Sequence, residues 1–274
     1  QSGRSDRAPI PRNPGTPMAQ YEAPYGIIGP PVSYAMAARR YMHEYGEDRT
    51  RQAMAEIAVS TRKWANLNPM AYFYDKPATF DDYHNSKWVA WPFHLLDCCL
   101  VTDAGAAIVI TTPERARDAK NGSVTILGAA EGHDHSGISQ MPNLTKAFGR
   151  HTGPQALQMA GITHSDLDLA MIYDSFTYTV LVSIENLGFC APGEGPDLVA
   201  SQRTAPGGDF PVNTNGGGLS YTHPGMYGIF TIVEAVRQLR GQAGERQLDN
   251  CDLAVAHGTG GLLSSTGTVV LGVQ

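Results

Sequence analysis

The second half of the chain alternates short apolar runs with amphipathic segments, and this rhythm limits its fold more than any other feature. Five apolar runs of strand length are separated by stretches of helical periodicity, and the runs are 123–130, 169–174, 210–215, 253–258 and 267–272. Strands that are apolar on both faces must be covered by helices on both sides of their sheet. The pattern therefore predicts an α/β fold.

The first part of the chain is expected to be mainly helical. Apolar residues at helical spacing predict helices over 32–46 and 50–69. Thr79, followed three residues later by Asp82, predicts a capping box at the start of a further short helix. The apolar segment 106–114 is expected to form a strand before the α/β rhythm begins.

Composition excludes several classes of protein. The 274 residues carry 20 Lys and Arg against 26 Asp and Glu, a net charge of −6 with the signs interspersed, which argues against nucleic acid and anionic membrane surfaces. No apolar run approaches the roughly 20 residues of a membrane helix. Four cysteines are too few and too irregularly spaced for a disulfide scaffold or a structural zinc site, which favours a reducing cytoplasm.

The N-terminal lead-in and a histidine pair each carry a further expectation. The Pro-rich segment 1–31 is unusual at the start of a globular enzyme and is not typical of a signal peptide, so we expect the chain to begin in mid-fold. His133 and His135 alternate along an extended segment but lack an evident third ligand. We therefore expect no metal site.

Polar side chains follow three of the predicted strands. The segments are 173–176 (YDSF), 213–225 (NTNGGGLSYTHPG) and 257–261 (HGTGG). In helix-covered sheets, ligands bind beyond the carboxyl ends of strands. We expect the three segments to converge on one pocket and to face a single ligand.

His223 is the first candidate in this pocket. It precedes Pro224, which suits the first position of a helix predicted over 224–241. The positive field of a helix N-terminus favours a neutral imidazole, whose N–H can donate to a developing oxyanion. Glycines 216–218 would let the backbone approach a ligand closely. The alternative is a simple cap and turn, with His223 bonded internally.

His257 is the second candidate. It can act as a general base, and the amides of Gly258 and Gly260 can hold an oxyanion. The alternative is a strand-end histidine bonded to a carbonyl, with the glycines making a turn.

The remaining candidates lie beside these histidines. Tyr173 can donate a hydrogen bond, and Asp174 can orient a histidine, although Asp174 or Ser175 can equally cap the following helix. Asn213 and Tyr221 are candidates for the substrate loop, and packing is the alternative for the tyrosine.

Taken in order, the three motifs resemble those of the thiolase superfamily. They are most similar to the sterol-carrier-protein and lipid-transfer-like branch, with its His-Asp-Cys-Phe motif, its Gly-His-Pro motif and a histidine-containing replacement for the Cys-x-Gly loop. The resemblance implies two similar halves in a five-layered αβαβα fold. Residues 1–112 would be the end of the N-terminal half with its loop or lid region, and residues 113–274 the C-terminal half. The opening strands and the nucleophilic cysteine of the first half would then lie outside this chain, either on a preceding segment of a longer polypeptide or on a separate chain.

The resemblance also implies roles for single residues. His223 matches the histidine that polarises the thioester or ketone oxygen, and His257 matches the histidine of the lipid-transfer branch. Tyr173 and Asp174 match the first two residues of His-Asp-Cys-Phe, while Ser175 stands where that motif has its acid/base cysteine. Both acid/base thiols of ordinary thiolases are therefore replaced.

Three functions follow from the resemblance. The first is an acyl-CoA enzyme of thiolase type, given a nucleophilic cysteine on the preceding segment. The second is retro-aldol cleavage of a β-hydroxyacyl-CoA, as in steroid side-chain aldolases. The third is a non-catalytic acyl-CoA or lipid-binding subunit. The resemblance further implies CoA as thioester carrier with no other cofactor, a homodimeric core, and a small acyl-CoA-binding partner built of an OB-fold and a zinc ribbon.

Overall fold

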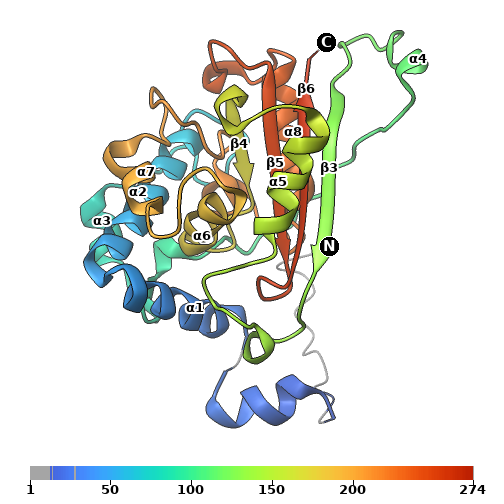
Figure 1. Ribbon diagram of the computed structural model, residues 1–274. Coiled ribbons are helices and arrows are strands. Elements are labelled where there is room, and N and C mark those ends of the chain that lie inside the picture. The colour runs from blue at the N-terminus through green and yellow to red at the C-terminus, as the bar shows by residue number, and fades with distance from the viewer. Residues whose placement is uncertain (1–12, 14, 28, 274) are drawn as a thin grey trace.

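A mixed β-sheet with helices on both faces forms the centre of the protein (Figure 1). The computed structural model describes residues 13, 15–27 and 29–273. The α-helices are α1 (Pro30–Tyr45), α2 (Glu47–Ala65), α3 (Phe80–Asn85), α4 (Pro113–Ala116), α5 (Gly149–Ala160), α6 (Thr177–Leu187), α7 (Gly195–Val199) and α8 (Gly228–Leu239). The strands are β1 (Trp88–Ala90), β2 (Phe93–His94), β3 (Thr125–His133), β4 (Leu169–Ile172), β5 (Leu253–Gly260) and β6 (Ser265–Gly272).

The central sheet has the strand order β3-β6-β5-β4, in which only β4 and β5 run parallel. Four of the five predicted strands are thereby confirmed as β3, β4, β5 and β6. The fifth, predicted over 210–215, lies beside β4 but makes only one bridge, between Val212 and Ala170. Asn213 adopts a left-handed backbone with φ 54°, which ends the extended pairing after this bridge.

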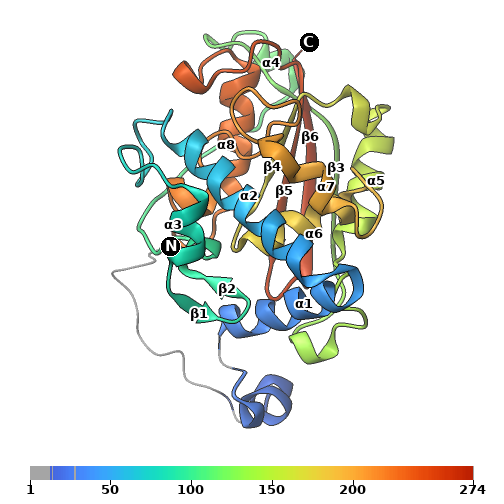
Figure 2. The same ribbon diagram turned by 90° about the vertical axis from the view of Figure 1, so that its left-hand side faces the viewer.

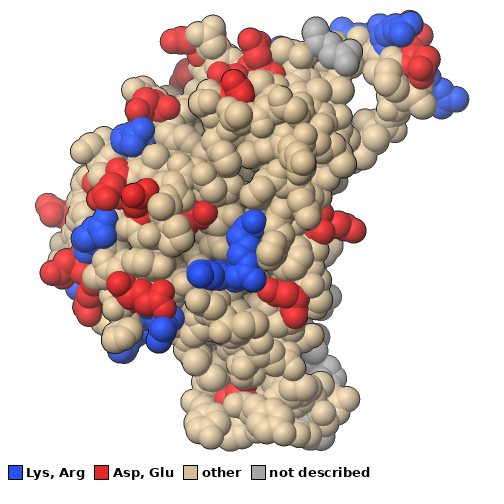
Figure 3. Space-filling model, in the orientation of Figure 1, with Lys and Arg blue, Asp and Glu red and all other residues tan. Residues whose placement is uncertain are grey.

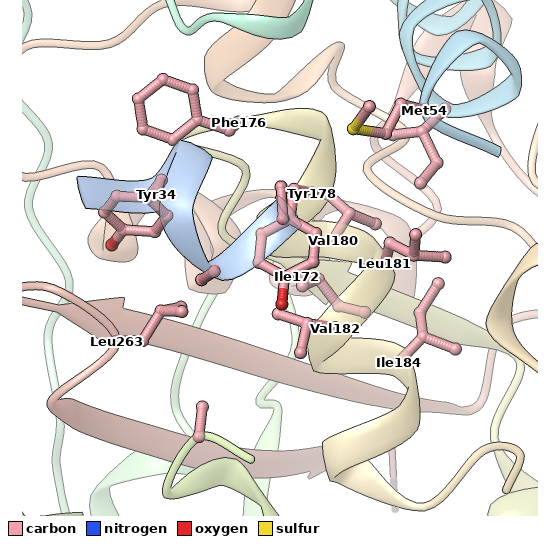
Figure 4. Packing of buried hydrophobic residues seen from close by; sticks show 14 of the residues in the cluster. Tyr34, Met54, Ile172, Phe176, Tyr178, Val180, Leu181, Val182, Ile184 and Leu263 are labelled. Atoms are coloured by element: carbon pink, nitrogen blue, oxygen red, sulfur yellow. The ribbon is translucent and has the colours of Figure 1, made fainter. Parts of the chain in front are cut away.

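Helix α6 is the most deeply buried element on one face of the sheet. All of its eleven residues are buried, including the polar side chains of Thr177, Glu185 and Asn186. It packs against the sheet through residues such as Ile172 and Val255, and α1 and α2 cover its other side (Figure 2). Figure 4 shows Leu181 and Ile184 of α6 among the side chains of this cluster, with Met54 of α2 beside them.

Helix α8 covers the opposite face of the sheet. Its residues Ala235 and Leu239 pack with Met171 of β4 and with Ala254 and Ala256 of β5. Side chains alternate between the two faces of a strand. Residues of even number on β5 therefore face α8, and those of odd number face α5 and α6.

Two expectations about secondary structure are wrong. Segment 106–114 is not a strand: within the described part of the chain no neighbouring strand pairs with it, and Val109 is 93% exposed. The helix predicted from Pro224 begins four residues later, at Gly228. His223 thus lies in a loop before the helix and not at its first turn.

The helical layer agrees with the sequence pattern. Helix α1 ends at Tyr45, before Gly46, whose φ of 102° favours glycine, and α2 follows directly. The capping box at α3 is confirmed, because Thr79 Oγ1 accepts from the amide of Asp82 at 3.1 Å and the carboxylate of Asp82 accepts from the amide of Thr79 at 2.8 Å.

Charged side chains are interspersed on the face shown in Figure 3, without a continuous basic patch. None of the helices in the described ranges is both long and apolar enough to cross a bilayer.

The burial of α6 predicts a large effect of a single truncation. Leu181→Ala should lower the free energy of unfolding by about 2–5 kcal/mol, because it removes a fully buried side chain from the main core. Met70→Ala, at a methionine that is 67% exposed, should change it by less than about 0.5 kcal/mol. Urea unfolding followed by circular dichroism measures both values, and equal losses would contradict this view of the core.

Candidate active site

A buried carboxyl group, Asp174, organises the loop that carries His223. Asp174 is completely buried, and its two oxygens accept from the amides of Gly218 at 2.5 Å and Leu219 at 3.1 Å. The sequence indicated that Asp174 orients a histidine or caps a helix. The structure shows that it binds the glycine loop immediately before the histidine.

The three glycines of this loop allow the backbone to wrap around that carboxyl group. A Cβ atom on Gly217 would lie 2.0 Å from Asp174 Oδ2, and the residue has a φ of 61°. A Cβ atom on Gly216 would lie 2.6 Å from the Cβ of Ala65 on α2. The close approach expected of these glycines is therefore made to the protein's own side chains.

Tyr173 and His223 form a hydrogen-bonded pair. Tyr173 follows β4 directly, and its amide donates to the carbonyl of His257 at 2.9 Å, which places its side chain at the end of the sheet. Its hydroxyl lies 2.7 Å from Nε2 of His223. The two rings are stacked, with centroids 5.5 Å apart, and the ring of Tyr227 stacks on both.

His223 is held from a distant part of the chain by Thr102. The amide of His223 donates to Thr102 Oγ1 at 2.8 Å, and the same hydroxyl bonds Thr222 at 2.8 Å. The amide of Thr102 donates back to the carbonyl of His223 at 3.3 Å. Thr102 could not be identified from the sequence, since no local pattern connects it with residues 120 positions away.

The pair opens onto a cavity of about 830 Å³. Its wall combines the start of α1, segment 173–176, the loop 223–230 and the turn 259–261. The predicted segments 173–176 and 213–225 therefore supply Tyr173 and His223. The third segment, 257–261, supplies Thr259, Gly260 and Gly261 to the cavity wall. The size suits a small-molecule ligand.

Burial controls the charge of the pair. Loss of solvation lowers the pKa of His223 to about 4, so its imidazole is neutral at pH 7 and Nε2 can accept a proton. The sequence predicted that the positive field of a helix N-terminus would keep the imidazole neutral. Because α8 begins only at Gly228, burial and not that field lowers the pKa of His223. Burial also raises the pKa of Tyr173 above its ordinary value, so the phenol is protonated at rest.

None of the four thiols of the chain is activated. Cys99 lies in the cavity wall, but burial, followed by the charge of Asp174, raises its pKa to about 12. Burial likewise raises the pKa of Cys98, Cys190 and Cys251 to about 12. A thiol with such a pKa is protonated at neutral pH and is a poor nucleophile.

The ring of His257 lies on the other face of the sheet. It pairs with Ile172 across the strands and shares the α5 and α6 face with Val255. Its Nδ1 lies 2.8 Å from Thr268 Oγ1, which in turn bonds Thr152 of α5 at 2.9 Å. Burial lowers its pKa to about 4. The structure therefore does not bring the rings of His257 and His223 together.

The other candidates divide between cavity and packing. Ser175 and Gly260 line the cavity, whereas Gly258 borders a shallow depression near β6. Asn213 is fully buried and accepts from the amide of Ile172 at 2.8 Å, which ties the loop to β4. Tyr221 packs against Phe230 with ring centroids 5.9 Å apart.

The histidine pair near residue 134 has a structural environment. His135 is buried, with Nδ1 2.5 Å from Asp134 Oδ1 and Nε2 3.0 Å from the carbonyl of Leu262. Among the described residues, no group of three or more His, Cys, Asp and Glu side chains is placed to hold a metal ion.

Comparison with known proteins agrees with this fold. The family described as thiolase C-terminal domain-like matches residues 130–273. A solved structure of an Ltp2-ChsH2(DUF35) aldolase superimposes with a TM-score of 0.84 and 33% identity, covering 97% of this chain and 69% of that chain. The chain therefore belongs to the thiolase superfamily, and the predicted thiolase-like α/β fold is confirmed.

Two curated relatives have 41% identity to the chain. One is a steroid side-chain-cleaving aldolase of Thermomonospora curvata, aligned over 86% of this chain and 61% of its own length. The other is a 17-hydroxy-3-oxo-4-pregnene-20-carboxyl-CoA lyase of Mycobacterium tuberculosis, aligned over 81% of this chain and 58% of its own length. The chain thus spans about three fifths of the length of these relatives.

The burial of Asp174 predicts a pH-dependent stability. Desolvation raises its pKa to about 7, so between about pH 4 and 7 the folded protein keeps a proton that the unfolded chain releases. This contribution is fully present below about pH 4 and is lost as the pH rises through about 7. As the pH rises through this window, the unfolding free energy of the wild type should therefore fall relative to that of Asp174→Asn, by about 1 kcal/mol per pH unit. Urea titrations at several pH values measure it, and a constant difference would refute the assignment.

Proposed function

We propose that the protein cleaves the bond between the α and β carbons of a β-hydroxyacyl-CoA by a retro-aldol reaction. The observation that carries this proposal is the hydrogen bond between Tyr173 and a neutral His223 on the wall of the cavity. A retro-aldol reaction needs a base for the β-hydroxyl and a way to return one proton, and it needs no nucleophilic thiol.

The pair can move the proton in both directions. The substrate hydroxyl gives its proton to Tyr173 Oη while the tyrosine gives its own proton to Nε2 of His223. The Cα–Cβ bond then breaks, the former β-carbon leaves as a ketone, and the electron pair becomes the enolate of the thioester. The same pair returns the proton to the α-carbon, which gives the shortened or released acyl-CoA. The low pKa of His223 makes its imidazolium a strong acid for this last step.

Thiolase-type acyl transfer is the second candidate, and the family itself favours it. That reaction requires a thiolate, which the four thiols of this chain do not supply because burial raises their pKa to about 12, so its nucleophile would have to lie outside this chain. Ser175, where thiolases of the sterol-carrier type have a cysteine, bonds Thr179 at 2.8 Å. The aldolase and lyase names of the two relatives support the retro-aldol reaction.

The substrate and partner extend the same proposal. We propose a bulky, steroid-like acyl group, supported by the relatives' names and by a cavity of about 830 Å³. CoA is the thioester carrier, and we propose no other cofactor. The name of the similar aldolase structure includes a second component, ChsH2(DUF35), which supports a small acyl-CoA-binding partner. The homodimeric core, the cytoplasmic location and the domain division between residues 112 and 113 stay predictions.

The reaction type is tested with two substrates. The native protein should release a ketone from a β-hydroxyacyl-CoA without free CoA, and Tyr173→Phe should lower kcat by about 10²–10⁴ because the proton relay is lost. Tyr178→Phe, at a buried tyrosine outside the cavity wall, is the matched control and should keep kcat within about twofold. Activity only with a β-ketoacyl-CoA plus free CoA would favour acyl transfer.

The pKa of His223 predicts the acid limb of the reaction. Since burial lowers this pKa to about 4, the imidazole stays neutral well below the ordinary histidine range. kcat/KM should be level from about pH 7 to pH 5 and fall as the pH approaches about 4. Steady-state rates at constant ionic strength measure the profile, and an acid limb near the ordinary histidine pKa of about 6.5 would show that His223 is solvated in the working enzyme.

A further inference from the structure

Two further residues that carry hydroxyl groups, Tyr34 and Thr259, line the same cavity. Tyr34 comes from the second turn of α1, and Thr259 from the end of β5. Neither was singled out from the sequence. We call the two hydroxyls the hydroxyl subsite.

The Tyr34 hydroxyl interacts with the hydroxyls of Thr259 and Ser175 and with the backbone of Leu263, but only loosely bonds its one close acceptor, the carbonyl of Gly261. Tyr34 Oη donates to the carbonyl of Gly261 at 3.4 Å, well beyond the usual distance of about 2.7–2.8 Å. Thr259 is only 7% exposed, and its Oγ1 interacts with the Tyr34 hydroxyl but has no partner of normal hydrogen-bond geometry among the described residues. The hydroxyl of Ser175 bonds Thr179 at 2.8 Å and also interacts with the Tyr34 hydroxyl. A buried hydroxyl without a partner is costly, which points to a ligand atom at this place.

The chemistry of the subsite favours an uncharged or weakly charged oxygen. None of the described residues that line the cavity is Lys, Arg, Asp or Glu. A phosphate or carboxylate group would therefore lack a counter-charge here. Burial raises the pKa of Tyr34, so the phenol stays protonated and donates. Two neutral donors suit a carbonyl oxygen that gains negative charge as an enolate forms.

The hydroxyl subsite and the Tyr173–His223 pair border one space. Cys99, which also lines the cavity, interacts electrostatically with both Tyr34 and Tyr173, so both tyrosines lie near it. The ring of Tyr34 packs against Phe176 with centroids 4.8 Å apart, and Figure 4 shows its hydroxyl pointing away from Phe176 on the side of Leu263. In a β-hydroxyacyl thioester, the hydroxyl and the thioester oxygen are carried by one short carbon chain.

We infer that Tyr34 and Thr259 bind the thioester carbonyl oxygen of the acyl-CoA, while Tyr173 and His223 take the proton of the β-hydroxyl. This assignment rests on the proposed function for the identity of the ligand. It makes the two hydroxyls catalytic residues, since their hydrogen bonds strengthen as charge moves from the β-oxygen to the thioester oxygen.

The test compares two ligands that differ in one oxygen. Isothermal titration of the native protein measures the Kd of an acyl-CoA thioester and of the matching CoA thioether, in which a methylene replaces the carbonyl group. The wild type should bind the thioester about tenfold more tightly. Tyr34→Phe, which keeps the ring packing on Phe176, and Thr259→Val, which keeps the side-chain shape, should each reduce this preference about threefold or more.

Tyr178→Phe is the matched control. Tyr178 is fully buried, and its hydroxyl also donates to a backbone carbonyl, that of Leu144 at 3.3 Å, but it does not line the cavity. It should keep the wild-type preference. The assignment would be overturned if Tyr34→Phe and Thr259→Val both kept the wild-type preference for the thioester over the thioether. It would also be overturned if Tyr173→Phe lost this preference.

The binding readout separates the two proposals. If the variants lose the thioester preference but no substrate is turned over, the proposed reaction fails and the subsite stands. If retro-aldol turnover is found and the preference is unchanged in both variants, the reaction stands and the subsite fails. Thermal unfolding of each variant identifies a loss of fold, and the two substitutions lie on separate elements, so one remains informative.

Discussion

The site depends on the buried contact between Asp174 and the backbone of the glycine loop. The two carboxyl oxygens of Asp174 accept from the consecutive amides of Gly218 and Leu219. These two hydrogen bonds fix the direction in which the chain leaves the loop toward His223. Asp174 follows Tyr173 directly in the segment after β4. The contact between Asp174 and the glycine loop therefore also places His223 beside Tyr173. Glycine is needed at position 217 because any side chain there would overlap the carboxyl oxygens.

Desolvation without a nearby counter-charge gives the site its chemistry. The cavity is lined by apolar, hydroxyl and imidazole groups, and burial shifts Tyr173, His223 and Cys99 toward their neutral forms. A neutral imidazole can accept a proton from the tyrosine, whereas a protonated thiol cannot act as a nucleophile. The same environment therefore disfavours thiolysis by these cysteines and supports proton transfer through Tyr173 and His223.

The strands, the main helices and the strand-end motifs could be predicted because they depend on local periodicity and turn residues. The structure of segment 106–114 could not, because an apolar segment becomes a strand only when another strand lies beside it. Proline is favoured at the first position of a helix, so the sequence predicts that α8 begins at Pro224. In the structure Pro224 lies in a loop, and α8 begins at Gly228. His257 was grouped with His223 because a sequence does not show which face of the sheet a strand-end side chain will take.

Short-range pattern in the chain was enough to define the fold class, the family motifs and the residue types available for chemistry. Which of those residues face each other was settled by packing. The choice of Tyr173 as the partner of His223, the support from Thr102 and the presence of Tyr34 in the cavity all depend on contacts between distant segments. Strand parity and burial set these contacts, and neither is visible until the sheet and its helices are packed together.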